Sequence, residues 1–323
     1  MAHGKRYLIT GGAGFIGSHL AEALLDRGNV VTIIDDLSTG RMANIAHLQD
    51  HVYFHCVIDT IEHEMVLDHL VSACDAVFHL AAAVGVRLVI QDPVRTIKTN
   101  ILGTQVVLEA AARYRTPVLL ASTSEVYGKS IKVPFVENDD RVLGPTSKSR
   151  WSYAESKAIE EFLGLAYHRQ YDLPVAIARL FNTIGPRQTG QYGMVVPSFV
   201  RQAVQGKNLT VYGDGTQSRC FCDVRDAVRA LINLIENPVA AGEVVNVGST
   251  EEITIADLAR RVLTLAGRPA DDIVFVPYAE AYGPGFEEMT RRVPDIGKIK
   301  RLIDWSPEIE LEQTLQDVMT HIA

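Results

Sequence analysis

The sequence lacks any uninterrupted apolar run of about 18 residues, the length that a membrane-spanning helix needs. Its first stretch, MAHGKRYLITGG, contains no apolar signal region and no cleavage site. Cysteine is scarce, with four residues, and the one Cys-x-Cys pair has no second pair or histidine cluster beside it. We therefore expect reduced thiols and no metal site. These absences predict a soluble, cytoplasmic protein with no membrane partner.

Positive charge is also in short supply. The 323 residues include 31 Lys and Arg against 39 Asp and Glu, which gives a net charge of −8. Proteins that bind nucleic acids usually present a basic face, so we expect no nucleic-acid partner. Any anionic ligand must then be held by a local group of cations. With 47% apolar and 22% charged residues, the chain can still build a large core.

Short apolar runs alternate with helical stretches through the first 180 residues. Strands are expected near 5–10, 30–35, 52–56, 76–80, 118–122 and 175–181, and helices near 15–27, 61–72, 93–114 and 152–171. Such alternation predicts an α/β fold with a doubly wound parallel sheet. Beyond Pro186 only short strands are expected, near 209–212 and 244–247, and helices are expected near 194–205, 223–236, 254–266 and 310–321. We expect residues 1–185 to form a dinucleotide-binding domain and residues 186–323 to form mainly a smaller substrate-binding lobe, with room for one segment that returns to the sheet.

A glycine-rich turn follows the first expected strand. Residues 11–17 read GGAGFIG, and Asp35 lies 18 positions after Gly17, at the end of the second strand. Gly11 permits a tight turn, Gly14 lets the backbone approach a pyrophosphate, and Gly17 allows close packing of helix on strand. Asp35 can accept hydrogen bonds from a ribose diol. The negative charge of Asp35 and Asp36 disfavours the 2′-phosphate of NADP, so the turn predicts a Rossmann site for NAD.

Tyr153 and Lys157 are separated by four positions in an expected helix, so their side chains share one face. An ammonium group and an oxidised nicotinamide beside a buried tyrosine favour the phenolate. Tyr153 could then act as a base near neutral pH. The spacing alone would more often indicate a surface pair. Coexistence with the glycine turn and with the segment around Thr123 favours the catalytic interpretation.

The G-x-x-G-x-x-G spacing resembles that of the extended short-chain dehydrogenase/reductase family, the NAD-dependent epimerases and dehydratases of nucleotide sugars. Further similar motifs cover nearly the whole chain: GGAGFIGSHL at 11–20, HLAA at 79–82, Asn100, Tyr127-Gly128, Tyr153-x-x-x-Lys157, FNxxGPR at 181–187 and RVPD at 292–295. The resemblance implies a homodimer formed through helices 93–114 and 152–171. It also implies NAD contacts from Gly11, Gly14, Phe15, Ile16, Gly17, Asp35, Asp59, Leu80, Ala81, Ala82, Asn100, Tyr153 and Lys157.

Residues 123–125, Thr-Ser-Glu, distinguish between the subfamilies. Sugar-nucleotide 4,6-dehydratases typically have Asp-Glu after the threonine, and here Ser124 replaces that aspartate. Simple 4-epimerases usually lack the glutamate. Thr-Ser-Glu, the approach to the tyrosine at 144–152 and the segment at 217–221 resemble UDP-glucuronate decarboxylases, which include UDP-xylose synthase and the oxidative decarboxylase of aminoarabinose synthesis. In contrast, Gly85-Val86-Arg87 looks more like UDP-glucuronate 4-epimerases.

The chemistry implied by this resemblance begins at C4 of the sugar. Tyr153 removes the hydroxyl proton while a hydride passes to NAD, and a ketone β to a C6 carboxylate allows carbon dioxide to leave. Glu125 is expected to position the ring or a water and to assist protonation at C5. The implied catalytic residues are Thr123, Ser124, Glu125, Tyr153, Lys157 and Arg219. The implied substrate contacts are Arg87, Lys98, Asn182, Arg219 and Arg292.

The leading hypothesis is an NAD-dependent UDP-glucuronate decarboxylase that acts on a UDP-sugar through a 4-keto intermediate. One alternative is a UDP-sugar 4-epimerase that acts on UDP-glucuronate, UDP-glucose or UDP-GlcNAc, in which case C4 inverts and no carbon is lost. A remote alternative is a non-catalytic NAD-binding regulator. The sequence leaves open whether NADH is recycled or released.

Overall fold

A parallel sheet of seven strands forms the centre of the molecule. The computed structural model describes residues 4–85, 92–190, 193–282, 287 and 289–323. The strand order is β11-β6-β5-β4-β1-β2-β3, and every neighbouring pair is parallel. This order confirms the doubly wound α/β fold. The strands are β1 (Arg6–Thr10), β2 (Val30–Asp35), β3 (Phe54–Ile58), β4 (Ala76–His79), β5 (Val118–Thr123), β6 (Val175–Leu180) and β11 (Val244–Val247).

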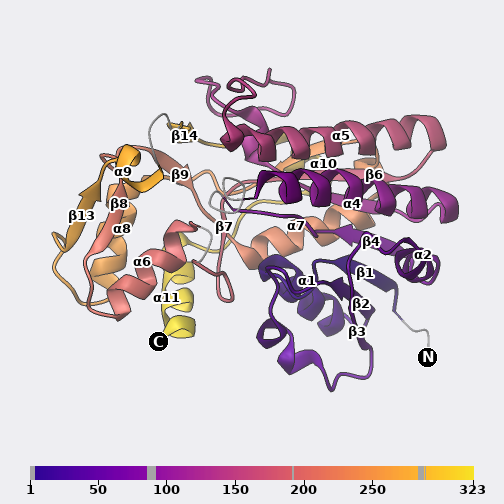
Figure 1. Cartoon of the computed structure of the whole chain (residues 1–323). Coiled ribbons are helices and arrows are strands. Elements are labelled where there is room, and N and C mark those ends of the chain that lie inside the picture. The colour runs from indigo at the N-terminus through magenta and orange to yellow at the C-terminus, as the bar shows by residue number, and fades with distance from the viewer. Residues whose placement is uncertain (1–3, 86–91, 191–192, 283–286, 288) are drawn as a thin grey trace.

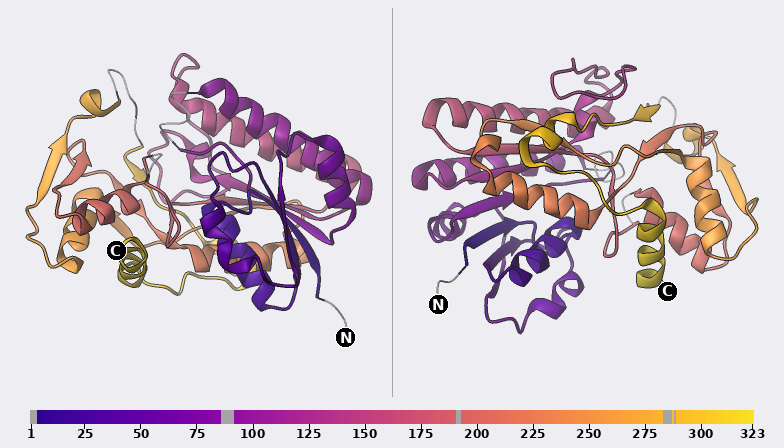
Figure 2. Two further views of the ribbon diagram at one scale, coloured as in Figure 1. Left: turned by 60° about the horizontal axis from the view of Figure 1, so that its bottom comes forward. Right: turned by 180° about the vertical axis from the view of Figure 1, so that it is seen from behind.

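Helices cover both faces of this sheet (Figures 1 and 2). One face carries α2 (Glu64–Ser72), α4 (Pro93–Tyr114) and α5 (Ser152–Tyr171), and the other carries α1 (Phe15–Asp26), α7 (Val224–Glu236) and α10 (Gly297–Ile303). Successive strand residues serve opposite faces. Leu8 packs into the core beneath α2 and α4, whereas Ile9 packs into the core beneath α1 and α7. Burial on both sides explains why the strands are continuous apolar runs.

The seventh strand comes from the last third of the chain. Residues 244–247, which the sequence pattern places among the short strands after Pro186, pair with Ile177–Leu180 of β6. Since α7 and α10 also pack on this sheet, the chain beyond residue 186 contributes to both parts of the molecule. The link to the sheet is a long-range contact that local sequence patterns do not reveal.

A second core lies at the carboxyl edge of the sheet, at the left of Figure 1. Phe199, Leu209, Leu258 and Leu315 are among its buried residues. Its helices are α6 (Val195–Val204), α8 (Ile255–Leu265), α9 (Tyr278–Tyr282) and α11 (Leu311–Ile322). Its short strands are β7 (Thr183–Ile184), β8 (Leu209–Tyr212), β9 (Ser218–Cys220), β10 (Cys222–Asp223), β12 (Glu252–Thr254), β13 (Ile273–Val276) and β14 (Arg291–Arg292).

Within the described residues, the remaining regular elements are short 3₁₀ turns. Two of them matter for the site, η3 (Ser124–Tyr127) after β5 and η4 (Ser149–Trp151) before α5. The others are η1 (Met42–Asn44), η2 (Ala46–Leu48) and η5 (Pro238–Ala240).

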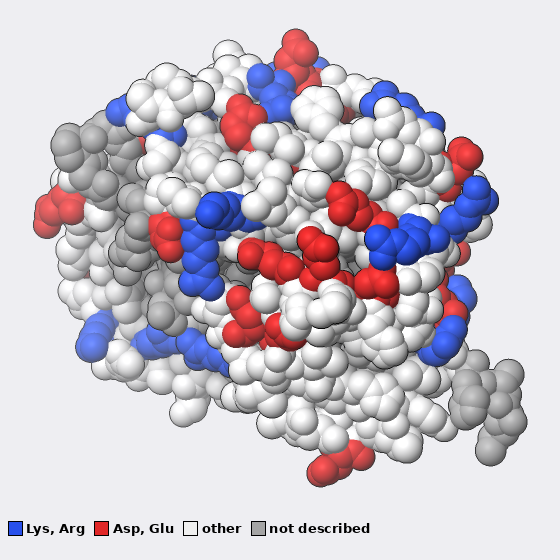
Figure 3. Space-filling model, turned by 45° about the vertical axis from the view of Figure 1, so that its right-hand side comes forward, with Lys and Arg blue, Asp and Glu red and all other residues white. Residues whose placement is uncertain are grey.

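On the face shown in Figure 3, acidic and basic side chains are interspersed. Across the described ranges, none of the helices combines the length and apolar character needed to cross a bilayer.

Candidate active site

The glycine turn between β1 and α1 is shaped by close backbone contacts. Gly11 has φ +72°, and a Cβ atom there would lie 2.9 Å from Cα of Ala81. A Cβ atom on Gly17 would lie 2.2 Å from the carbonyl oxygen of Gly11. The helix begins after Gly14 with no side-chain cap and no acidic residue in its first turn. Its amide groups and dipole therefore suit an anion such as a pyrophosphate.

Two carboxylates lie beyond this turn, at the carboxyl ends of neighbouring strands. Asp35 ends β2 and accepts hydrogen bonds from the amides of Ala13 at 2.9 Å and Leu37 at 2.8 Å. Burial raises the pKa of Asp35, although these amides oppose the shift. Asp59 follows β3, and its amide donates to the carbonyl of Asp35 at 3.2 Å. The hydrogen bond between Asp59 and His63 lowers the pKa of Asp59.

The loop after β4 is tied to two helices. The amide of Ala83 donates to Oδ1 of Asn100 at 2.8 Å, and Nδ2 of Asn100 donates to Oγ of Ser156 at 3.0 Å. Asn100 therefore links this loop to α4 and α5. Ala81, whose amide donates to Oγ1 of Thr10 at 3.1 Å, holds the same loop against β1. The other predicted cofactor contacts lie at this edge: Phe15 and Ile16 open α1, and Leu80 and Ala82 flank Ala81.

Tyr153 and Lys157 occupy the first two turns of α5, and both side chains are buried. Nζ of Lys157 donates to Oε2 of Glu160 at 2.6 Å, and both of these side chains are only 3% exposed. The predicted catalytic lysine thus has a carboxylate partner that the motif does not include.

Burial and the nearby carboxylates favour the protonated phenol of Tyr153. Burial raises the pKa of Tyr153, and the carboxylates of Glu125 and Glu160 raise it further. A hydrogen bond with Thr123 and the charge of Arg292 act in the opposite direction, but more weakly. Ionisation of the phenol therefore requires additional positive charge.

Glu125 lies in η3 at the centre of a group of arginines. Arg150 binds it in a two-pronged arrangement, with Nη1 on Oε2 and with Nη2 3.1 Å from Oε1. Nη1 of Arg292 lies 3.4 Å from Oε1. Burial opposes the ionisation of Glu125, but the charges of Arg150, Arg292 and Arg219 lower its pKa to about 2. Near neutral pH this side chain is a carboxylate that accepts hydrogen bonds.

The second lobe supplies two of these arginines through a single strand pairing. Arg219 in β9 lies directly opposite Arg292 in β14, in parallel register. Arg219 is buried and its Nη1 donates to the carbonyl of Ser218 at 2.7 Å. Asn182, which follows β6, donates to the carbonyl of Cys220 at 2.9 Å and so joins the sheet to β9.

The remaining predicted residues are less closely connected. Ser124 is buried, and its Oγ has no hydrogen-bond partner in the parts of the chain that the structure describes. Lys98 lies on an exposed part of α4. Arg87 lies outside the described residues.

Arg150 and Glu160 are absent from the predicted site residues. Arg150 nevertheless contacts Glu125, and Glu160 contacts Lys157. For Glu160 there was a local signal, because Lys157 and Glu160 are three positions apart on one helix. Arg150 and Glu125 are 25 positions apart, and no periodic pattern connects them.

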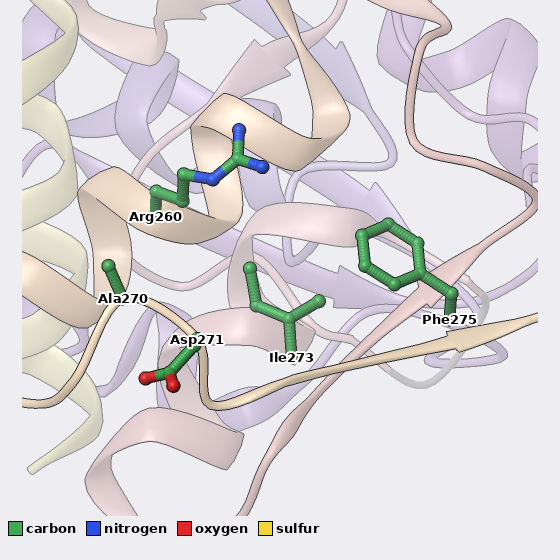
Figure 4. A pocket seen from close by; sticks show the side chains of 5 residues that line it. All are labelled: Arg260, Ala270, Asp271, Ile273 and Phe275. Carbon is green, nitrogen blue, oxygen red and sulfur yellow. The ribbon is translucent and has the colours of Figure 1, made fainter.

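No group of three or more His, Cys, Asp or Glu side chains within the described ranges could hold a metal ion. A separate hollow beside α8 and β13 is lined by Arg260, Ala270, Asp271, Ile273 and Phe275 (Figure 4). None of the residues around Tyr153 or Glu125 lines it.

The sheet is doubly wound, a glycine turn follows its first strand, and a buried Tyr/Lys pair lies on α5. This combination is typical of α/β enzymes that bind a dinucleotide. The model of the GDP-mannose 4,6 dehydratase family matches residues 8–318, and the chain belongs to that family. A UDP-N-acetyl-alpha-D-glucosaminuronate decarboxylase from Bacillus cytotoxicus is 45% identical over 98% of this chain and 97% of its own. UDP-glucuronic acid decarboxylase 1 from Danio rerio is 38% identical over 99% of this chain and 73% of its own.

Solved structures agree with the fold. A UDP-glucuronic acid 4-epimerase from Bacillus cereus, in complex with UDP-glucuronic acid and NAD, superposes with a TM-score of 0.88. It is 30% identical and the match covers 98% of each chain. A UDP-glucose 4-epimerase from Thermotoga maritima with UDP-glucose gives a TM-score of 0.87 at 29% identity, again over 98% of each chain.

Proposed function

We propose that this chain is an NAD-dependent decarboxylase of a UDP-linked uronic acid that works through a 4-keto intermediate. The observation that carries the proposal is the group of Arg150, Arg219 and Arg292 around the carboxylate of Glu125, near Tyr153; Arg150 and Arg219 are buried, and the side chain of Arg292 is 12% exposed. Arg219 and Arg292 come together through the pairing of β9 with β14, and their charges and that of Arg150 all act on Glu125. A diphosphate and a sugar carboxylate would both be stabilised there. The decarboxylases that are 45% and 38% identical support this choice.

The glycine turn fits a dinucleotide because side chains at Gly11 or Gly17 would collide with backbone there. Gly11, Gly14 and Gly17 would hold the pyrophosphate, and Asp35 would hold a ribose. When bound, NAD supplies a hydride acceptor and a positive charge. The complexes of related enzymes with NAD support this cofactor.

The chain's own residues would then act as follows. Thr123 orients the C4 hydroxyl, and Tyr153 removes its proton. Arg219 and Arg292 hold anionic groups of the substrate. Glu125, which stays ionised, orients a ring hydroxyl or a water rather than donating a proton. Once C4 is a ketone, the carbon–carbon bond to the carboxylate breaks and carbon dioxide leaves, while the bonding electrons are delocalised into an enolate. A water oriented by Glu125 would then protonate C5.

The proposal is tested with UDP-glucuronate and UDP-N-acetylglucosaminuronate labelled at C6. We expect the label to appear in carbon dioxide, and mass spectrometry of the remaining UDP-sugar measures the matching loss. If C6 stays in every product while C4 inverts, the protein is a 4-epimerase. That second candidate is favoured by the Bacillus cereus structure. A Tyr153→Phe variant with unchanged sugar turnover would instead favour a non-catalytic NAD-binding regulator.

We also propose that residues 186–323 mainly bind the sugar nucleotide, and that two copies of the chain associate through α4 and α5. Five apolar side chains on these helices are exposed: Val94, Ile97, Leu102, Ile159 and Phe162. Two such helices from each copy would make a four-helix bundle and would bury these residues. The described cysteines are free thiols, which suits the cytoplasm as the location that we propose.

The dimer is tested by light scattering of Phe162→Glu, a charge placed at a side chain that is 63% exposed. We expect this variant to be monomeric and folded. Val52→Glu is the control, because Val52 is 76% exposed but lies outside α4 and α5. A Phe162→Glu protein with the same mass as the wild type would contradict the proposed interface.

A further inference from the structure

The ion pair between Lys157 and Glu160 is not required by the function proposed above. The two residues are three positions apart on α5, so Glu160 lies about one helical turn beyond the lysine, on the side away from Tyr153. Its Oε2 accepts from Nζ of Lys157 at 2.6 Å, whereas its Oε1 has no hydrogen-bond partner in the described part of the chain. Burial raises the pKa of Glu160, and the charge of Lys157 and hydrogen bonds with Lys157 and Thr104 oppose that shift.

The other ionisable groups nearby do not offer Lys157 a competing partner. His79 on β4 lies between Thr10 and Thr104, with hydrogen bonds of 2.8 Å to each. Burial and then the charge of Lys157 lower the pKa of His79 to about 3, so this imidazole is neutral.

The next carboxylate along the helix is engaged elsewhere. Glu161 accepts from Nε and Nη2 of Arg179 at 2.9 and 2.7 Å. In η3, Glu125 is bound by Arg150 and Arg292. Glu160, like Glu125, raises the pKa of the Tyr153 phenol, so the ion pair with Lys157 places a negative charge that opposes ionisation of the phenol.

We propose that Glu160 is a positioning residue for the reaction: its carboxylate holds the ammonium of Lys157 behind Tyr153 and opposes loss of the phenolic proton. This role rests on the proposed function only through the oxidation at C4, which decarboxylation and epimerisation share. When bound, an oxidised dinucleotide would supply positive charge beside Tyr153 and would favour the phenolate against the opposing charge of Glu160.

The test compares Glu160→Gln with the wild type. Glutamine has the same shape and removes the charge, so the phenolate becomes easier to form. We expect the acid limb of kcat/KM to move to lower pH by about one unit. Ultraviolet difference absorbance of tyrosinate, with Tyr153→Phe as the blank, should give the same shift without reference to turnover. The control is Glu155→Gln, because Glu155 is on the same helix but pairs with Arg141 at the surface.

A Glu160→Gln protein with a slower rate but an unmoved midpoint would show a purely structural role and would overturn the proposal, as would a shift to higher pH. If the glutamine variant does not fold, Glu160→Ser removes the charge and admits water beside Lys157, and the same shift is expected. The kinetic profile is measured with whichever labelled UDP-sugar is turned over. Failure to release carbon dioxide would therefore reject the proposed decarboxylation without deciding the role of Glu160.

Discussion

Glu125 and Glu160 both act on Tyr153, but their surroundings shift their own pKa values in opposite directions. Glu125 is contacted by arginines from η4 and β14, and its pKa falls to about 2. Glu160 has one cation, Lys157, and its burial outweighs that cation, so its pKa is raised. Burial is similar for both. The comparison teaches that the number of cations in contact decides whether a buried carboxylate keeps its charge at low cost.

Removing Arg150 should disturb this contrast most. Arg150→Gln leaves buried Glu125 with less positive charge, and we expect a loss of about 3 to 5 kcal/mol in the free energy of unfolding. Arg150→Lys should recover part of that loss, since it keeps the charge but not the two-pronged contact. Urea unfolding measures both. Arg141→Gln, at the half-exposed pair with Glu155, is the control. A loss below about 1 kcal/mol for Arg150→Gln would show that the buried Arg150–Glu125 pair stabilises the fold no more than the surface Arg141–Glu155 pair does.

The free energy of unfolding at acidic pH should depend on Glu125 and Glu160 in different ways. Glu125 has a folded pKa of about 2 against an ordinary value of 4.5, so its contribution is present above pH 4.5 and is lost as pH falls toward 2. The shift corresponds to roughly 3 kcal/mol. Glu125→Gln should flatten this pH dependence in denaturant unfolding at a series of pH values.

Glu160→Gln should not flatten the same pH dependence. Because the pKa of Glu160 is raised in the folded state, its protonation at falling pH favours folding rather than opposing it. Equal flattening by both variants would show that the surroundings of the two carboxylates do not differ as described.

The smallest effect should come from the neighbour of Arg292. Arg291 forms an exposed two-pronged pair with Glu252 at 2.8 Å, and its side chain is 53% exposed. Arg291→Met should cost less than about 1 kcal/mol, because solvent screens such pairs. Arg292→Met, one position along, removes a cation from Glu125 and should cost several times more. Melting temperatures of the two proteins measured side by side test this ranking.

Most strands of the sheet could be predicted from the sequence because each one is specified by its own short run of residues. The first six strands are β-branched or apolar runs bounded by helices, and the structure places each within about two residues of its predicted limits. The helices over 93–114 and 152–171 have the predicted bounds. By contrast, β11 has the same apolar character as the short strands of the second lobe. Its place beside β6 depends on packing between residues more than sixty positions apart.

The candidate site divides in the same way. Gly11, Gly17 and the pair of Tyr153 and Lys157 carry fixed spacings that a sequence displays directly. Arg150 reaches Glu125 from a short 3₁₀ turn after a loop without periodicity, so no spacing rule could have joined them. Arg292 reaches it through a two-residue strand, β14, which is too short to leave a pattern.

The position of β11 has a consequence for how the protein is made. Until residues 244–247 leave the ribosome, β6 has an unpaired row of amides and carbonyls along its outer side. A fragment that stops near residue 185 would keep this row open and would be prone to strand-to-strand association with other copies. The last third of the polypeptide thus adds β11 outside β6, so that β6 becomes an inner strand of the sheet. A fragment that ends between the two cores would lack this strand and would be prone to associate rather than to fold as an independent unit.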